Sequence, residues 1–213
     1  MLKPRVAVLV SGGGTNLQAL IDARESGLLK SGELALVVSS RADAFALERA
    51  KRAGIASAVV ERSAFAAREA YEAALLTVLA EHRIDVIVLA GFMQILSAAF
   101  VKRYPNRMIN VHPSLIPAYC GRGYYGLKVH EAVLAAGETV TGATVHMVNE
   151  VPDGGRILLQ KTVDILPGDT PETLQRRVME QAEWRLLPAA AELLCADLLK
   201  RTERENSEWN DGN

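Results

Sequence analysis

The sequence predicts an α/β protein with a doubly wound, mostly parallel sheet, an antiparallel edge pair of strands and a long C-terminal helix. Three observations lead to this prediction. Apolar, β-branched runs at 5–10 and 85–90 are typical of strands buried on both faces of a parallel sheet. Helical patterns separate the strand patterns at regular intervals. Two later strand patterns, 139–149 and 156–165, are joined by a tight turn, which favours antiparallel pairing.

The first half of the chain alternates strand and helix. Strand 5–10 runs into a triple-glycine turn, and Leu17, Leu20 and Ile21 follow at helical spacing. Gly54 is a suitable residue to end the second helix, since glycine readily adopts the left-handed conformation that closes a helix. The elements expected after the first helix are strand 34–38, helix 44–53, strand 56–60, helix 65–82, strand 85–90, helix 97–103 and strand 108–111.

The second half begins with a loop rich in glycine and tyrosine at 118–127, followed by a helix at 128–136. After the two antiparallel strands, Thr170 and Pro171 are an N-cap and a first helical residue. The helix that they start is expected to reach about residue 200, with a bend at Pro188. We therefore expect one domain over 1–200 and a disordered polar tail over 201–213.

Composition excludes several classes of protein. The chain has 213 residues and a formal net charge of -1, so it offers no basic surface for a nucleic acid. Two cysteines are too few for a disulfide framework or a four-cysteine zinc site. No apolar run approaches the ~20 residues of a membrane span, and the six-residue apolar run near the N-terminus is too short for the apolar region of a signal sequence, so we expect none. We expect a cytoplasmic protein that acts on small molecules as a monomer or homodimer.

The triple-glycine turn predicts a phosphate site. Gly14, Thr15 and Asn16 lie where a strand passes into a helix, whose first amides and partial positive charge attract anions. The spacing is not that of a dinucleotide fingerprint, and no Gly-Lys-Ser/Thr motif for a triphosphate follows. The pattern fits a cradle for a monophosphate. The alternative is a purely structural turn.

Asn110 and His112 are the best candidates for chemistry. Alternate residues of a strand share a face, so this amide and imidazole reach into one cleft, and Pro113 and Pro117 restrict the chain that leaves the strand. Asp153 would favour the imidazolium form and raise the pKa of His112, provided that it lies within about 6 Å. The alternatives are a solvent-facing histidine and an ordinary Asp-Gly turn.

We expect structural roles for the other polar candidates. His82 is expected to cap a helix and His130 to lie on a helix surface, while Thr144 and His146 face inward and support the site from behind. Cys120 is expected to be inert. The apolar loop that follows the strand at 85–90 is either core or a surface that grips a flat heteroaromatic ring.

Together these motifs resemble the glycinamide ribonucleotide formyltransferase family, the folate-dependent enzymes of purine biosynthesis. The resemblance extends from Val6 to about Pro188. It rests on five motifs in the same order, which are Ser-Gly-Gly-Gly-Thr-Asn-Leu at 11–17, Ala-Gly-Phe-Met-Gln-Ile-Leu at 90–96, Asn-Val-His-Pro-Ser-Leu-Ile-Pro at 110–117, Thr-Gly-Ala-Thr-Val-His at 141–146 and Asp-Gly-Gly at 153–155.

The resemblance implies transfer of a formyl group from N10-formyltetrahydrofolate to the glycine amine of 5-phosphoribosyl-glycinamide, without a metal. Asn110 and His112 would stabilise an oxyanion, and Asp153 would assist His112. The residues implied to bind the ribonucleotide are Gly14, Thr15, Asn16, Glu180, Gln181, Ala182 and Glu183. Those implied to bind folate are Arg68, Met93, Gln94, Ile95, Leu96, Asn110, Asn149, Glu150, Val151, Pro152 and Asp153.

The chain departs from the family pattern at three places. Gln94 stands where a basic residue is common, and Glu180 where a neutral amide is common. The loop 119–126 is longer than in many members, and we expect it to reshape the entrance without touching the chemistry. Three alternatives stay open: methionyl-tRNA formyltransferase and formyltetrahydrofolate hydrolase, each expected to need a further domain, and a non-catalytic mononucleotide-binding module.

Overall fold

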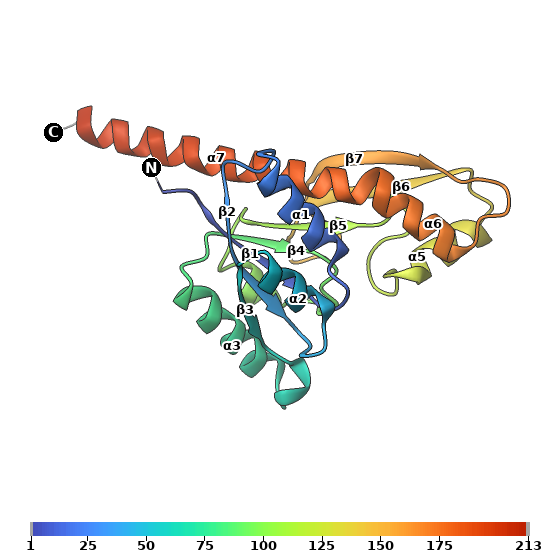
Figure 1. Ribbon diagram of the computed structural model, residues 1–213, viewed down its shortest axis with the longest axis horizontal. Coiled ribbons are helices and arrows are strands. Elements are labelled where there is room, and N and C mark those ends of the chain that lie inside the picture. The colour runs from blue at the N-terminus through green and yellow to red at the C-terminus, as the bar shows by residue number, and fades with distance from the viewer. Residues whose placement is uncertain (1, 212–213) are drawn as a thin grey trace.

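The computed structural model describes residues 2–211, with the backbone alone for 205–211, and a seven-stranded sheet runs through this part (Figure 1). The strand order is β3-β2-β1-β4-β5-β6-β7. Strands β1 to β5 are parallel, and the β5–β6 and β6–β7 pairs are antiparallel, which confirms the predicted sheet. The strands are β1 (Arg5–Val10), β2 (Glu33–Ser39), β3 (Ala56–Val59), β4 (Val86–Leu89), β5 (Met108–His112), β6 (Val140–Met147) and β7 (Ile157–Asp164).

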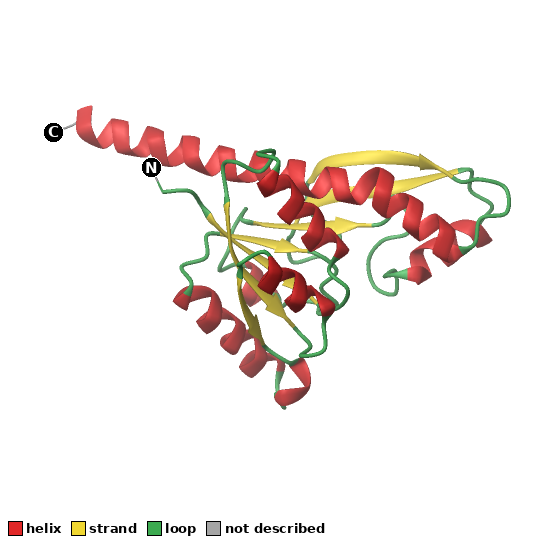
Figure 2. Ribbon diagram, viewed as in Figure 1, coloured by secondary structure: helices red, strands yellow, loops and turns green. Residues whose placement is uncertain are grey.

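Helices cover both faces of the sheet (Figure 2). Side chains of β1 alternate between the two cores: Val6, Val8 and Val10 face one, and Ala7 and Leu9 face the other. Helices α1 (Thr15–Glu25), α2 (Phe45–Arg52), α5 (Leu127–Ala135), α6 (Pro171–Val178) and α7 (Trp184–Asp211) pack in the first core. Helices α3 (Arg68–Glu81) and α4 (Ala98–Val101) pack in the second core. Both faces are buried, which explains the continuous apolar runs in the sequence.

The strand order reverses between β1 and β4, because successive strands are added to opposite sides of β1. In open α/β sheets a ligand crevice forms at such a point, beyond the carboxyl ends of the strands. The triple-glycine turn follows β1, the apolar loop follows β4 and His112 ends β5. The topology therefore brings the three candidate segments to one edge of the sheet.

The C-terminal helix differs from the expectation in two respects. A π-helical turn, Met179–Glu183, separates α6 from α7, and Pro188 lies downstream of it, inside α7. The helix continues to Asp211 rather than to about residue 200, and its end extends away from the body in Figure 1. The disorder predicted for 201–213 stays a prediction, and residues 212 and 213 lie outside the described part. Within that part, no helix has both the length and the apolar character of a membrane span.

Candidate active site

A cavity of about 1020 Å³ opens at the carboxyl ends of β1, β4 and β5. Its wall includes the triple-glycine turn, the apolar loop after β4, the end of β5 and the turn that carries Asp153. A loop between β5 and α5, helix α6 and the π-helical turn complete it. Every motif on which the sequence analysis relied therefore contributes to one cavity.

The glycine cradle, which we define as Gly12, Gly13, Gly14, Thr15 and Asn16, forms one end of this cavity. Gly14 has φ of 70°, and a Cβ atom there would lie 2.6 Å from the Cβ of Ala46. Only glycine fits, because both the dihedral and the space exclude a side chain. Helix α1 begins directly after Gly14, and no side chain caps it. Its first amides face the cavity end, as an anion site requires.

Asn16 connects the cradle to the C-terminal helix. Its Nδ2 donates a hydrogen bond of 2.7 Å to Glu183 Oε2, while its buried Oδ1 has no partner within the described residues. The π-helical turn directs Ala182 and Glu183 inward, whereas Glu180 and Gln181 are exposed and lie outside the cavity wall. Burial raises the pKa of Glu183 to about 7, against the opposing effect of the Asn16 hydrogen bond.

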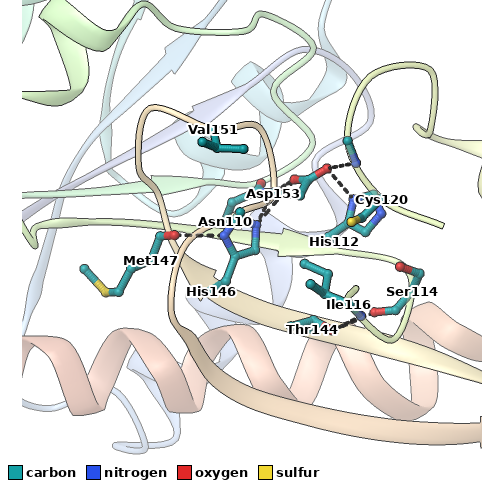
Figure 3. Close-up of polar contacts among 12 residues, drawn as sticks. Asn110, His112, Ser114, Ile116, Cys120, Thr144, His146, Met147, Val151 and Asp153 are labelled. Carbon is teal, nitrogen blue, oxygen red and sulfur yellow. Dashed lines mark hydrogen bonds and ion pairs between the residues drawn. The ribbon is translucent and has the colours of Figure 1, made fainter. Parts of the chain in front are cut away.

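The other end of the cavity holds the acid–base cluster, which we define as Asn110, His112, His146 and Asp153 (Figure 3). Asp153 Oδ2 lies 3.5 Å from His112 Nδ1, and Asp153 Oδ1 lies 3.4 Å from His146 Nε2. Asn110 Nδ2 lies 3.2 Å from His146 Nε2 and donates to Asp153 Oδ1 at 3.4 Å. The His112–Asp153 distance meets the 6 Å requirement set from the sequence.

The turn that carries Asp153 needs glycine beside it. Asp153 has φ of 54°, which aspartate tolerates better than most residues. A Cβ atom on Gly155 would lie 1.7 Å from the carbonyl oxygen of Met147, so only glycine allows the backbone to approach β6 so closely. Asn149 closes the turn, since its Oδ1 accepts from the Val151 amide at 2.9 Å and its Nδ2 donates to the Gly154 carbonyl at 3.2 Å. The turn thereby holds the carboxylate over β5.

The charge on His112 differs from the sequence-based expectation. Burial lowers the pKa of His112 below its ordinary value, and Asp153 and the Tyr119 carbonyl only partly oppose this effect. The predicted rise in pKa is therefore wrong for the unliganded protein, because the imidazole is only 4% exposed. For Asp153, burial acts to raise the pKa, but the hydrogen bond with His146, the His112 charge and the Gly121 amide together lower it. The pair accordingly favours an ionised Asp153 beside a neutral His112.

The loop after β5 contacts the cluster directly, contrary to the expectation that it would not touch the chemistry. His112 Nε2 donates to the Tyr119 carbonyl at 2.8 Å, and the Gly121 amide donates to Asp153 Oδ2 at 2.9 Å. Because Pro113 and Pro117 restrict the chain after β5, it folds back over His112. The backbone of this loop thus orients the imidazole and the carboxylate. Cys120 donates to the Pro117 carbonyl, and burial raises its thiol pKa, in accord with the expected inert role.

Comparison with known proteins identifies the family. The family model described as "Formyl transferase" matches residues 4–191. The chain belongs to the formyl transferase family.

Individual members of this family resemble the chain over nearly its whole length. It is 42% identical to phosphoribosylglycinamide formyltransferase of Escherichia coli, over 97% of this chain and 93% of that protein. It is 45% identical to the trifunctional purine biosynthetic protein adenosine-3 of Drosophila pseudoobscura pseudoobscura, but spans only 15% of that longer protein. Glycinamide ribonucleotide transformylase 1 of Symbiobacterium toebii superposes with a TM-score of 0.85 at 40% identity, covering 92% of this chain and 89% of that one.

The residues that the formyl transferase resemblance assigned to folate divide into two groups. Residues 93–96 and 149–153 line the cavity, and Met93 and Ile95 expose apolar side chains there, as a site for a flat ring requires. Arg68 does not line the cavity. It pairs with Glu72 at 3.0 Å and donates to the Ile95 carbonyl, so it fixes the loop from outside.

Thr144 contacts the segment that follows β5. Its Oγ1 donates to the Ser114 carbonyl at 2.6 Å and accepts from the Ile116 amide at 3.2 Å, which anchors the segment after β5. His146 was expected to support the site residues from the side away from the cavity, yet it contacts Asp153 directly. Sequence alternation along β6 indicated that both residues face inward, but not that His146 reaches the carboxylate.

His82 and His130 lie outside the cluster, and the sequence predicted a structural role for each. His82 caps the end of α3, with Nδ1 2.9 Å from the Val78 carbonyl, which confirms the prediction. His130 was expected on a helix surface, and this is wrong: it is fully buried, because α5 packs against α6. Neither of its ring nitrogens has a partner within the described residues, and burial lowers its pKa to about 4.

Sequence reasoning missed two residues that hold the apolar loop. Buried Glu72 accepts hydrogen bonds from both the amide and the hydroxyl of Ser97. Ser11 Oγ accepts from the Met93 amide at 2.9 Å and thus ties the loop to the end of β1. The four-residue spacing from Arg68 to Glu72 indicates that these two residues are neighbours on a helix, but not that Glu72 contacts Ser97. No sequence signal indicates the contact of Ser11 with Met93.

Proposed function

We propose that this chain transfers the formyl group of N10-formyltetrahydrofolate to the glycine amine of 5-phosphoribosyl-glycinamide, a step of de novo purine biosynthesis. One observation carries the proposal: a single cavity has an anion cradle at one end and a carboxylate held against an imidazole and an amide at the other. The similarity to phosphoribosylglycinamide formyltransferase supports the choice of substrates. A cytoplasmic location and a monomeric or homodimeric state are part of the proposal.

The ribonucleotide binds with its phosphate at the glycine cradle, where backbone amides and the start of α1 stabilise the negative charge. Asn16 of the cradle and Glu183 beside it offer amide and carboxylate groups to the ribose hydroxyls. The unpartnered Oδ1 of Asn16 supports this placement, because a buried acceptor without a hydrogen bond is costly and a ligand hydroxyl would satisfy it.

The pterin ring lies between the apolar loop at 93–96 and the turn at 149–153. The exposed side chains of Met93, Ile95 and Val151 become covered when the ring binds, which contributes apolar burial to affinity. Backbone groups of the same two segments provide donors and acceptors for the edge of the ring. The formyl group then points toward the acid–base cluster, where the amine of the ribonucleotide meets it.

The acid–base cluster stabilises the charge that develops on the formyl oxygen as the amine attacks. Asn110 makes long hydrogen bonds of 3.2 and 3.4 Å in the free protein, so a negatively charged oxygen is a stronger competitor for its N–H groups. The same negative charge raises the pKa of His112, which burial depresses in the free protein. His112 then takes up a proton from solvent at Nδ1, donates a hydrogen bond from it to the oxyanion while Nε2 stays bound to the Tyr119 carbonyl, and releases the proton again when the oxyanion collapses.

Asp153 transfers the proton that the reaction has to move. Attack gives the substrate nitrogen a positive charge, and the departing folate nitrogen needs a proton, so one proton must move between them. An ionised Asp153 stabilises the imidazolium of His112 and accepts the amine proton, directly or through water, before passing it on. The cycle ends with the carboxylate ionised again and both products neutral at the reacting atoms.

The decisive experiment is an assay of formyl transfer with three acceptors: 5-phosphoribosyl-glycinamide, methionyl-tRNA and water. We expect turnover with the first acceptor only. Transfer to methionyl-tRNA or rapid hydrolysis would support one of the related formyl-folate activities instead. Binding of the ribonucleotide without any turnover, by protein whose circular dichroism shows a folded chain, would support a non-catalytic module.

A further inference from the structure

Arg122 is the one lysine or arginine among the described residues that line the active-site cavity. It lies in the loop between β5 and α5, one residue after the Gly121 amide that binds Asp153. Its side chain is exposed and forms no hydrogen bond or ion pair within the described part of the chain. An unpaired cation in a cavity that binds anionic substrates is a candidate contact for one of their anionic groups.

The charge balance of the cavity makes this cation important. Three carboxylates line the wall, those of Glu150, Asp153 and Glu183. A phosphate monoester carries about -1.5 to -2 charges at pH 7. Without Arg122, backbone amides and the partial charge of α1 would hold this anion in a cavity whose described wall has no lysine or arginine. The guanidinium therefore adds a full positive charge to the wall of a site for a phosphorylated ligand.

Two other arginines near the cavity are already engaged. Arg49 lies behind the glycine cradle, where it donates to the Gly13 carbonyl at 2.8 Å and to Gln18 at 2.9 Å. Arg68 is held by Glu72 and the Ile95 carbonyl. Neither lines the cavity, so neither can replace Arg122 without breaking contacts that maintain the wall.

We propose that Arg122 is a substrate-binding residue that pairs with the 5′-phosphate of the ribonucleotide held in the glycine cradle. This inference rests on the proposed function. It adds a specificity-determining cation to a site in which the sequence motifs indicated only backbone and uncharged contacts for the phosphate. Arginine suits the task, because its planar fork donates two parallel hydrogen bonds to a phosphate.

The backbone of the loop contacts the acid–base cluster through Gly121, and helix packing connects the loop with the phosphate end of the cavity. The loop leads into α5, which packs against α6, and α6 continues into the π-helical turn. Met179 of that turn contacts Thr15 of the cradle at 3.8 Å, and Glu183 binds Asn16. The loop and the cradle are thus both connected to α6, the loop through α5 and the cradle through the π-helical turn. On the folate side, Glu150 presents a carboxylate that is paired with Lys102 at 3.1 Å.

Steady-state kinetics of Arg122→Met and Arg122→Lys test the inference. We expect Arg122→Met to raise KM for 5-phosphoribosyl-glycinamide by roughly ten- to hundredfold, the range for loss of a hydrogen bond to a charged group. The kcat and the KM for the formyl-folate should stay within about twofold. Arg122→Lys should recover part of the loss, since it keeps the charge but not the fork. The matched control is Arg156→Met, which removes an exposed arginine outside the cavity wall.

A direct measurement separates this inference from the proposed function. Titration calorimetry with ribose 5-phosphate at fixed ionic strength should show weaker binding to Arg122→Met than to the unsubstituted protein or to Arg156→Met. This readout needs no turnover, so it stands even if formyl transfer is not observed. Equal binding by all three proteins would overturn the inference. A raised KM for the formyl-folate in place of the ribonucleotide would also overturn it, because Arg122 would then bind the folate tail.

Discussion

The glycine cradle consists of consecutive residues from a single turn, whereas the acid–base cluster takes its members from β5, β6 and the turn at Asp153. The cradle binds through backbone amides whose positions follow from the start of α1. The cluster acts through side chains whose distances depend on the pairing of β5 with β6, which places Asn110 opposite His146. Binding at the cradle is therefore sensitive to added side-chain volume, whereas the reaction at the cluster is sensitive to loss of a functional group.

Support for these two ends also differs. The cradle is held by packing of Gly14 against Ala46 and by the Asn16–Glu183 hydrogen bond. The cluster is held by backbone groups of the loop after β5 and by the turn at Asp153. Substitutions at the cradle should therefore affect binding and stability together, while substitutions in the cluster should affect the chemical step and leave the fold intact.

The largest effect is expected for His112→Ala. Loss of one oxyanion donor typically costs about 2.7–4 kcal/mol of transition-state stabilisation, so kcat should fall by roughly 100- to 1000-fold. The KM for the ribonucleotide should change little, because the phosphate end of the site is intact. Steady-state kinetics, with circular dichroism as a check of folding, measure both quantities. Near-normal turnover by a folded variant would remove His112 from the mechanism.

Gly14→Ala should damage the cradle through sterics. The left-handed φ of 70° and the 2.6 Å approach to the Ala46 Cβ both oppose a methyl group. We expect a loss of about 2–3 kcal/mol in the free energy of unfolding, together with a raised KM for the ribonucleotide. Urea titration and kinetics provide the two readouts. Gly12→Ala is the matched control, since a Cβ atom there meets nothing within 4 Å. Equal loss of stability in both variants would contradict the steric explanation.

His130 should make stability depend on pH. The folded state holds its pKa near 4, while the unfolded chain titrates near 6.5. Between these values the unfolded state binds the proton and the folded state does not, so stability falls as the pH falls through this window. The contribution amounts to about 2 kcal/mol between pH 7 and pH 5.

Urea titrations of His130→Leu at both pH values measure this effect. Relative to the unsubstituted protein, the variant should gain about 2 kcal/mol of stability between pH 7 and pH 5, since leucine has a similar volume and no ring nitrogen to protonate, while the contributions of His112 and Glu183 are common to both proteins. His82→Leu, which removes a histidine at the end of α3, should show no such gain. A pH dependence that His130→Leu retains in full would assign the effect to other groups.

The smallest effect is expected for Thr144→Val. This substitution removes the bonds to the Ser114 carbonyl and the Ile116 amide, two contacts that anchor the segment after His112. We expect a loss of about 1–2 kcal/mol in stability and a decrease of only a few-fold in kcat, because Thr144 does not line the cavity. Thr144→Ser, which keeps the hydroxyl, should restore most of the kcat. Failure of serine to do so would show that the methyl group, not the hydrogen bond, matters.

Much of the fold followed from local patterns. Apolar β-branched runs and helical spacings indicated the alternation of strand and helix, and the short connection at 150–155 indicated the antiparallel edge. The glycine turn and the same-face placement of Asn110 and His112 followed from the periods of helix and strand. These features depend on neighbours in the chain, so the sequence alone contains them. Family resemblance supplied Glu183 and the substrates.

Tertiary structure decided what depends on distant groups. The depressed pKa of His112 and the burial of His130 result from packing that no local pattern describes. The contact of His146 with Asp153 arises where a turn folds over β6, and the Tyr119 carbonyl reaches His112 because the loop folds back. The sequence by itself determined which elements form and which side chains share a face. Their charge states and partners were decided only by tertiary structure, because desolvation and long-range hydrogen bonds exist only once the chain is folded.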